Sequence, residues 1–176
     1  MNQMQISRRS WVIGATTGIV AASLGAGGGP ASEPTLAPAP APGKKKDKGP
    51  PIATNLVKEF VGAGHANLPR VREMLAAYPT IINGTWDWGG GDFETALGGA
   101  SHMGRPDIAN VLLEHGARMD LFAAAMLGKL EIVRAACTAF PNAPSVPGPH
   151  GITLMDHAIK GGDAAVAVVE YLRSLS

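Results

Sequence analysis

The sequence has a single cysteine, only nine aromatic side chains and no large excess of either charge among its 176 residues. The single thiol, Cys137, has no internal partner, so disulfide formation contributes nothing to the fold. With few aromatic side chains and abundant glycine and alanine, we predict a thin core between closely spaced helices. The sequence also lacks a zinc-finger spacing, a phosphate loop and a nucleophile elbow. We therefore expect neither enzymatic activity nor a cofactor.

Charge is distributed unevenly along the chain. Residues 1–54 carry a net charge of +4, and residues 55–176 carry −3. Nucleic-acid binding requires a basic surface that neutralises phosphates. The mildly acidic second part therefore argues against nucleic acid as its partner.

Residues 1–29 have the features of an export signal. Ser7, Arg8 and Arg9 precede an uncharged, moderately apolar stretch that begins at Trp11. This arrangement resembles the S-R-R motif of twin-arginine signals, with Trp11 where phenylalanine is usual. The resemblance implies export of a folded protein to the periplasm or cell envelope. A signal for the general secretion route and an uncleaved membrane anchor remain as alternatives.

Residues 30–53 are predicted to form a disordered linker. Alternating alanine and proline favour extended polyproline II conformation, and the segment has no apolar surface to bury. The lysine-rich stretch at 44–48 is interpreted as a solvated charge run, with contact to anionic lipid as the alternative.

Residues 54–176 are predicted to contain four copies of a helix–turn–helix pattern. In the clearest copy, residues 94–117, Ile108 and Leu112 recur at helical spacing, with Gly104 in the turn and Gly116 at the end. Fainter copies cover residues 56–79, 121–140 and 150–175.

The third copy and the segment after it are less regular. We assign Ile132, Val133, Cys137 and Phe140 to the buried stripe of its second helix. The prolines between the third and fourth copies are predicted to forbid regular structure there.

The clearest copy resembles an ankyrin repeat. Thr95, Leu97 and Ala100 match T, L and A of the pattern T-P-L-H-x-A, while Gly98 replaces the histidine, and residues 112–117 resemble the ending L-L-x-x-G-A. The resemblance implies an all-α solenoid of about four helix pairs with short β-hairpin fingers. It also implies a concave groove that binds a protein partner, without catalytic residues. We expect a monomer.

The predicted finger between the first two copies has an unusual composition. It combines aromatic and acidic side chains with three glycines that permit a tight reversal. These side chains are Trp86, Asp87, Trp88, Asp92, Phe93 and Glu94. We predict that they bind a protein partner together with His102. In the alternative interpretation, the tryptophans pack on the helices while Asp92 and Glu94 cap the next helix.

A metal site formed by Asp87, Asp92, Glu94 and His102 is a competing hypothesis. The helical rise places His102 about 10 Å along the axis from Glu94, which argues against it. His65 is expected to approach His102 across the stack, but as a second solvent-exposed side chain.

The other histidines, His115, His150 and His157, do not follow any metal-ligand spacing. We therefore predict no metal site and a non-enzymatic, protein-binding module of the cell envelope. The alternative function is a small-molecule- or metal-binding domain, including a hydrolytic one, centred on Trp86–Glu94.

Overall fold

The computed structural model describes residues 49–175 of the chain. The predicted export signal, including Ser7, Arg8, Arg9 and Trp11, lies outside the described residues, as does most of the predicted linker. Within them the chain forms eight α-helices and one small two-stranded sheet, so the predicted mainly helical class is confirmed. None of these helices is long and apolar enough to span a membrane.

The elements follow one another in a regular order. The α-helices are α1 (Thr54–Gly64), α2 (Leu68–Ala77), α3 (Ala96–His102), α4 (Pro106–Glu114), α5 (Leu121–Met126), α6 (Leu130–Ala139), α7 (Leu154–Lys160) and α8 (Val166–Arg173). The strands are β1 (Thr85–Asp87) and β2 (Phe93–Thr95). Short 3₁₀ helices are η1 (Pro79–Asn83), η2 (Ala143–Ser145), η3 (Pro149–Gly151) and η4 (Gly162–Ala165).

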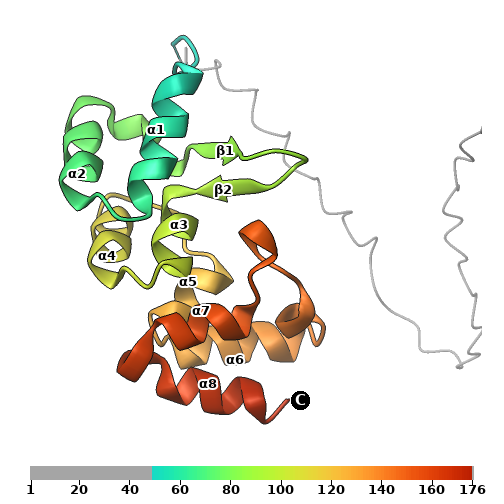
Figure 1. Ribbon diagram of the computed structural model, residues 1–176. Helices are drawn as coiled ribbons and strands as arrows, with labels where there is room; N and C mark the ends of the chain where they lie inside the picture. The colour runs from blue at the N-terminus through green and yellow to red at the C-terminus, as the bar shows by residue number, and fades with distance from the viewer. Residues whose placement is uncertain (1–48, 176) are drawn as a thin grey trace, which may run out of the picture. The chain divides into compact units, whose positions relative to one another are not determined.

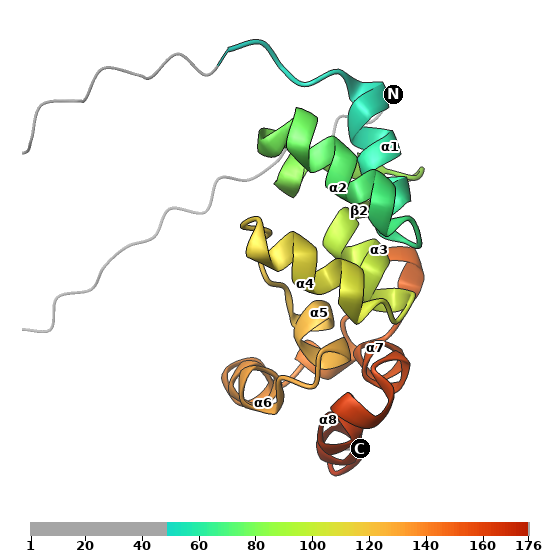
Figure 2. The ribbon, with the colours of Figure 1, turned by 90° about the vertical axis from the view of Figure 1, so that its left-hand side faces the viewer.

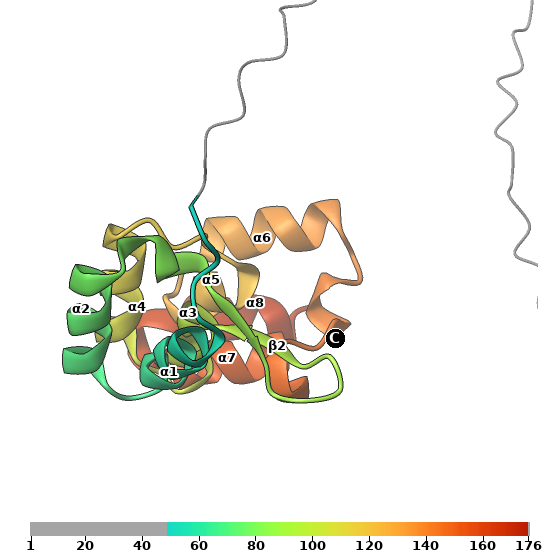
Figure 3. The same cartoon turned by 90° about the horizontal axis from the view of Figure 1, so that it is seen from above.

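The helices pack as successive antiparallel pairs. Each odd-numbered helix packs on the even-numbered helix that follows it, and α1, α3, α5 and α7 pack one on the next (Figure 1). Helices α2 and α4 lie together along one side of this row (Figure 2). The β-hairpin projects from the other side, as the view from above shows (Figure 3). This arrangement leaves the hairpin beside the ends of α1 and α3.

Side-chain caps set the starts of several helices. Helix α2 is capped by Asn67, whose side-chain oxygen accepts a hydrogen bond from the Arg70 backbone N–H at 3.1 Å. Helix α3 is capped by Thr95, whose hydroxyl accepts the Gly98 N–H at 3.0 Å. The alternative interpretation, in which Asp92 and Glu94 cap this helix, is wrong. Both carboxylates are left free for other contacts.

The core is thin and is divided at α5. Ala123 and Met126 belong to the buried cluster formed with the first four helices, whereas Ala124 and Ala125 belong to the cluster formed with α6, α7 and α8. Alanine side chains on both faces let α3 and α7 approach α5 closely. The prediction of closely spaced helices with small residues between them is confirmed.

The predicted stripe on α6 is only partly correct. Val133 and Cys137 are buried, but Ile132 and Phe140 are exposed. The apolar side chains of α6 spread over a wider face than α5 and α8 cover. Among the described residues, no further α-helix packs against the other side of α6.

The prolines between α6 and α7 do not exclude regular structure, contrary to prediction. Two short 3₁₀ helices, η2 and η3, form there. Proline fixes φ near the value that the first position of a helical turn requires, so it begins these turns instead of preventing them. As a result, η3 is held in a defined position beside the hairpin.

The turns within the helix pairs depend on glycine, as predicted. Gly104 and Gly128 have φ of +65° and +67°, in the left-handed region. Gly128 also faces the backbone of η4 so closely that an added Cβ would lie 1.8 Å from the Ala164 carbonyl oxygen. Gly116, which ends α4 with φ of +89°, has open space around it.

The different surroundings of Gly116 and Gly128 predict that alanine at these positions destabilises the protein to different extents. Gly116→Ala should destabilise the protein by about 1–2 kcal/mol, the cost of left-handed backbone alone. Gly128→Ala combines the same conformation with a backbone clash and should cost more than about 4 kcal/mol. Chemical denaturation of both variants measures the difference, and equal costs would show that the close approach at Gly128 is unimportant.

Candidate metal centre

The β-hairpin is a defined structure with a tight tip. Trp86 pairs with Glu94 in the antiparallel register, so both side chains lie on the same face, and Phe93 lies on the opposite face. The Asp87 carboxylate accepts the backbone N–H groups of Gly89 and Gly91 at 2.8 and 3.1 Å. Asp87 therefore stabilises the turn, and it is not among the side chains that cluster beside the hairpin.

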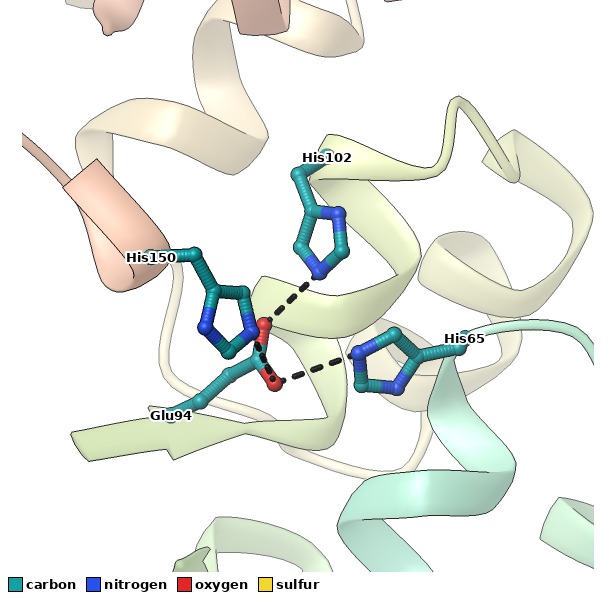
Figure 4. Close-up of side chains that lie close together, drawn as sticks. All are labelled: His65, Glu94, His102 and His150. Carbon is teal, nitrogen blue, oxygen red and sulfur yellow. Dashed lines mark ion pairs between the residues drawn. The ribbon is translucent and has the colours of Figure 1, made fainter. Parts of the chain in front are cut away.

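Four side chains from separate elements converge beside this hairpin (Figure 4). His65 follows the end of α1, Glu94 lies on β2, His102 ends α3, and His150 lies in η3. Each offers one nitrogen or oxygen ligand atom, and the four atoms all lie within 4.8 Å of one another. We call these residues the His₃Glu cluster.

The Glu94 carboxylate is at the centre of the cluster. Its Oε2 lies 3.3 Å from His65 Nε2 and 3.4 Å from His150 Nε2, and its Oε1 lies 3.0 Å from His102 Nε2. The Glu94 side chain is fully buried, and that of His102 is 9% exposed. The His65 and His150 side chains are 24% and 32% exposed. The cluster therefore has a buried floor and a rim that reaches solvent.

The outer ring nitrogens of two histidines are held by acceptors. His65 Nδ1 lies 3.1 Å from the Val61 carbonyl oxygen, and His150 Nδ1 lies 2.6 Å from Asp92 Oδ2. Because a carbonyl or carboxylate oxygen can only accept, we assign the proton of each ring to Nδ1. In the neutral ring, Nε2 then presents its lone pair to the centre. Metal-ligating histidines are oriented in this way by their outer partners.

Two buried atoms of the cluster have no hydrogen-bond partner among the described residues. They are Glu94 Oε1 and His102 Nε2, which are close to each other but not aligned as donor and acceptor. A buried polar group without a partner costs about 1–3 kcal/mol, so such atoms are uncommon in folded proteins. A cation between them would satisfy both.

Two glycines of α3 make room for the cluster. A Cβ added to Gly98 would lie 3.2 Å from Glu94 Cγ, and a Cβ added to Gly99 would lie 2.8 Å from His65 Nδ1. The side chains of Glu94 and His65 therefore lie directly against the helix backbone. Glycine at position 98 therefore has a local physical reason.

The electrostatics of the cluster favour an ionised carboxylate. Burial alone raises the pKa of Glu94, but the neighbouring nitrogens of His102, His65 and Trp88 outweigh it and hold that pKa far below its usual range. Contact with Glu94 raises the pKa of His65. The His150 backbone N–H and ring lower the pKa of Asp92. The cluster thus contains a buried negative charge that attracts protons or a cation.

Two side chains outside the cluster position its members. The Trp88 indole N–H donates to Glu94 Oε2 at 2.8 Å, which leaves Oε1 as the free oxygen. Asp92 accepts both the backbone N–H and the ring N–H of His150, at 2.9 and 2.6 Å. His150 has φ of +58°, which is unfavourable for a residue with a Cβ. Its two bonds to Asp92 hold it in this conformation.

The distance argument against a site at Glu94 and His102 is wrong. The helical rise does not separate the two side chains, because Glu94 lies on β2 and its side chain packs against the backbone of α3 at Gly98. Helical Cα–Cβ bonds also tilt toward the helix N-terminus, which brings the His102 ring toward the strand. The predicted approach of His65 to His102 is confirmed, with ring centroids 4.9 Å apart. The prediction that both side chains are solvent-exposed is wrong, because they are only 24% and 9% exposed.

The contribution of His150 was not predicted. It lies 58 residues from Asp92 in the chain, so no local ligand spacing includes it. The sequence shows only a histidine before Gly151 in a proline-rich segment. The path of this segment toward the hairpin depends on the fold.

The remaining residues assigned to the finger have different environments. The Trp86 ring is covered by the Lys58 ammonium at 5.5 Å, and Trp88 is 39% exposed beside His65 and His150. Phe93 is 61% exposed on the opposite face. The finger thus has an aromatic edge beside the cluster and one exposed ring, Phe93, that borders a shallow pocket with Phe122 and Pro147.

His157 lies under the cluster but does not join it. It is fully buried, its Nδ1 bonds the Thr153 carbonyl oxygen at 2.8 Å, and its ring centroid lies 6.4 Å from that of His102. Burial lowers the pKa of His157, whereas contact with Glu94 raises that of His65. The two histidines therefore affect stability in opposite directions.

We predict a stability maximum near pH 6.5 for protein stripped of metal by a chelator. Above the reference pKa of 6.5, stability should fall as pH rises through the raised pKa of His65. Below 6.5, stability should fall as pH drops through the lowered pKa of His157. Denaturant unfolding across this range measures both limbs. His65→Gln should flatten only the upper limb and His157→Gln only the lower one, and unchanged profiles in both would contradict the assignment.

The fold and the cluster together define a mainly helical protein with a partly buried histidine–carboxylate site at the base of a β-hairpin. No family model matches this sequence, and no curated protein matches it either.

Proposed function

We propose that this protein binds a divalent transition-metal ion through the His₃Glu cluster. The observation that carries the proposal is the convergence of four ligand atoms from four elements around one buried, ionised carboxylate. The unpartnered Glu94 Oε1 and His102 Nε2 support it further. From the sequence alone we predicted no metal site and gave metal binding as the alternative. We now propose that alternative.

The spacing of the ligand atoms supports coordination of an ion. With metal–ligand bonds of about 2.1 Å, neighbouring ligand atoms lie about 3.4 Å apart in a tetrahedron and about 3.0 Å apart in an octahedron. The 3.0 Å between Glu94 Oε1 and His102 Nε2 agrees with these values. His65 and His150 lie 3.3 and 3.4 Å from the other carboxylate oxygen, Oε2.

The chemistry of the ligands favours particular metals. Three imidazoles and one carboxylate suit zinc, iron, cobalt, nickel or copper. Calcium and magnesium prefer sites made of oxygen ligands. Cys137, the only thiol, is buried in the core formed with α6 and α8, so thiolate does not contribute to this site.

Protons offer the simplest alternative to a metal. If His65 and His150 were both protonated at Nε2, each could donate to Glu94 without an ion. Protonation leaves His102 Nε2 and Glu94 Oε1 misaligned, however, and puts two like charges on neighbouring rings whose centroids are 6.5 Å apart. A single divalent ion satisfies all four side chains at once. Metal and proton compete for the same atoms, so affinity should fall in acid.

The proposal predicts one equivalent of bound zinc or cobalt per chain after metal-free protein is loaded and dialysed. Glu94→Gln and His102→Ala remove ligands and should abolish stoichiometric binding. Asp92→Asn removes the carboxylate that orients His150 and should weaken affinity about 10- to 100-fold. Elemental analysis and competition with a chromophoric chelator measure both effects.

His115→Ala is the matched control. His115 Nδ1 bonds the Val111 carbonyl four residues earlier at 2.8 Å, as His65 Nδ1 bonds Val61, but His115 lies outside the cluster. This variant should bind metal as the wild type does. Wild-type protein that binds neither zinc nor cobalt would refute the proposal.

We also propose that the helix pairs form an ankyrin-type solenoid and that residues 1–29 export the protein by the twin-arginine route to the periplasm or cell envelope. The eight helices, the hairpin between the first two pairs and the left-handed turn glycines support the solenoid. The Arg8-Arg9 pair supports export. In the cell envelope, the site would take its metal from outside the cytoplasm.

Binding of a protein partner by the hairpin is a second candidate function. The observation in its favour is Phe93, a large apolar side chain that is 61% exposed on a rigid hairpin. Exposed aromatic residues on rigid elements are typical anchors of protein interfaces.

Phe93→Ala should then reduce cross-linking to an envelope partner by at least about tenfold, since a central aromatic anchor contributes more than about 1.4 kcal/mol. Phe140→Ala is the matched control, because Phe140 is also exposed, at 70%, but lies at the end of α6. Mass spectrometry of cross-linked partners compares the three proteins. Equal recovery of the same partners by all three would exclude the hairpin as the interface.

A further inference from the structure

We infer that the metal of the His₃Glu cluster keeps a coordination position open to solvent, which holds water and exchanges it for a small neutral or singly charged ligand. This inference rests on the proposed metal site and concerns its reactivity. A closed site would serve only to stabilise the fold, whereas an open one binds or activates a ligand.

The exposure of the cluster is one-sided. Glu94 and His102 form the buried floor, while His65 and His150 form a rim with side chains 24% and 32% exposed. Trp88, 39% exposed, stands beside both rim rings, with centroid distances of 6.0 and 6.3 Å. An ion held by the floor therefore has solvent on its remaining side.

The ligand atoms are too spread to enclose an ion. In a closed tetrahedral site every pair of ligand atoms lies about 3.4 Å apart. Here the set extends to 4.8 Å, even though each histidine comes within 3.4 Å of Glu94. The histidines are therefore spread around Glu94 (Figure 4). Higher coordination, with one or two positions left for water, fits this arrangement.

Trp88 limits how many coordination positions of the ion the Glu94 carboxylate can fill. Its indole N–H donates to Oε2 at 2.8 Å and occupies one acceptor position of that oxygen, whereas Oε1 has no hydrogen-bond partner among the described residues. Without this hydrogen bond, both carboxylate oxygens could coordinate, and the second would take a position otherwise left for solvent. Trp88 thus acts as a positioning residue that keeps Glu94 monodentate.

The charge around the cluster restricts which external ligand the ion can bind. A divalent ion with Glu94 leaves a local charge of +1, and Asp92 beside His150 offsets it. None of the ion pairs among the described residues brings a lysine or arginine to the cluster. Doubly charged oxyanions such as phosphate usually require such side chains. Water, hydroxide, azide or a single carboxylate fits better.

The test uses full-length protein loaded with cobalt(II), whose visible absorption depends on coordination. Azide is the probe, and inorganic phosphate at the same concentration is the comparison. We expect millimolar azide to change the cobalt spectrum with saturation and phosphate to leave it unchanged. Bound cobalt whose spectrum does not respond to azide would show a closed site and overturn this inference, while the proposed function would stand. Failure to bind either cobalt or zinc would overturn the proposed function itself.

Two tryptophan variants test the positioning role. Trp88→Phe frees Glu94 Oε2 to coordinate and should weaken azide binding at least about tenfold, while cobalt stays bound with equal or greater affinity. Trp86→Phe is the matched control, because Trp86 contacts Lys58 on the same hairpin and should leave the azide titration unchanged. A loss of cobalt affinity in Trp88→Phe without a change in azide affinity would contradict the role.

Discussion

The buried carboxylate of Glu94 is the constraint on which the site depends. A charge removed from water is unfavourable unless it is paired, and the pairing here comes from three histidines and one tryptophan. These partners come from α1, α3, the hairpin tip and η3, so the charge ties together segments that are distant in sequence. Removal of Glu94 would leave three histidines without a common partner.

The surrounding fold provides the precise placement that the cluster needs. Short helices with glycine and alanine at their contacts bring backbones close together, and Gly98 and Gly99 let two ligands lie against α3. The hairpin places Glu94 and Trp88 on one side, and η3 brings His150 from the far end of the sequence. Irregular segments between repeated helices thus carry the chemistry, while the helices provide a rigid support.

The two proposed roles of the hairpin lie on its two faces. Glu94 and Trp88 belong to the metal centre, whereas Phe93 points to the opposite side and is available to a partner. A metal ion that fixes Glu94 and His150 would also fix the strand that carries Phe93. Ligand binding at one face and protein binding at the other are therefore physically compatible, since each uses different side chains of the same short strand.

The helices, their turn glycines and the hairpin could be predicted from the sequence, because apolar periodicity, caps and left-handed turns are local properties. Asp92, Glu94, His65 and His102 were all noted from the sequence, but no metal site was predicted from them. The tertiary structure alone decided which of them meet. Whether Glu94 reaches His102 depends on where a strand lies against a helix, and the place of His150 depends on packing across 58 residues of chain. Such contacts arise from long-range packing, and no local spacing in the sequence encodes them.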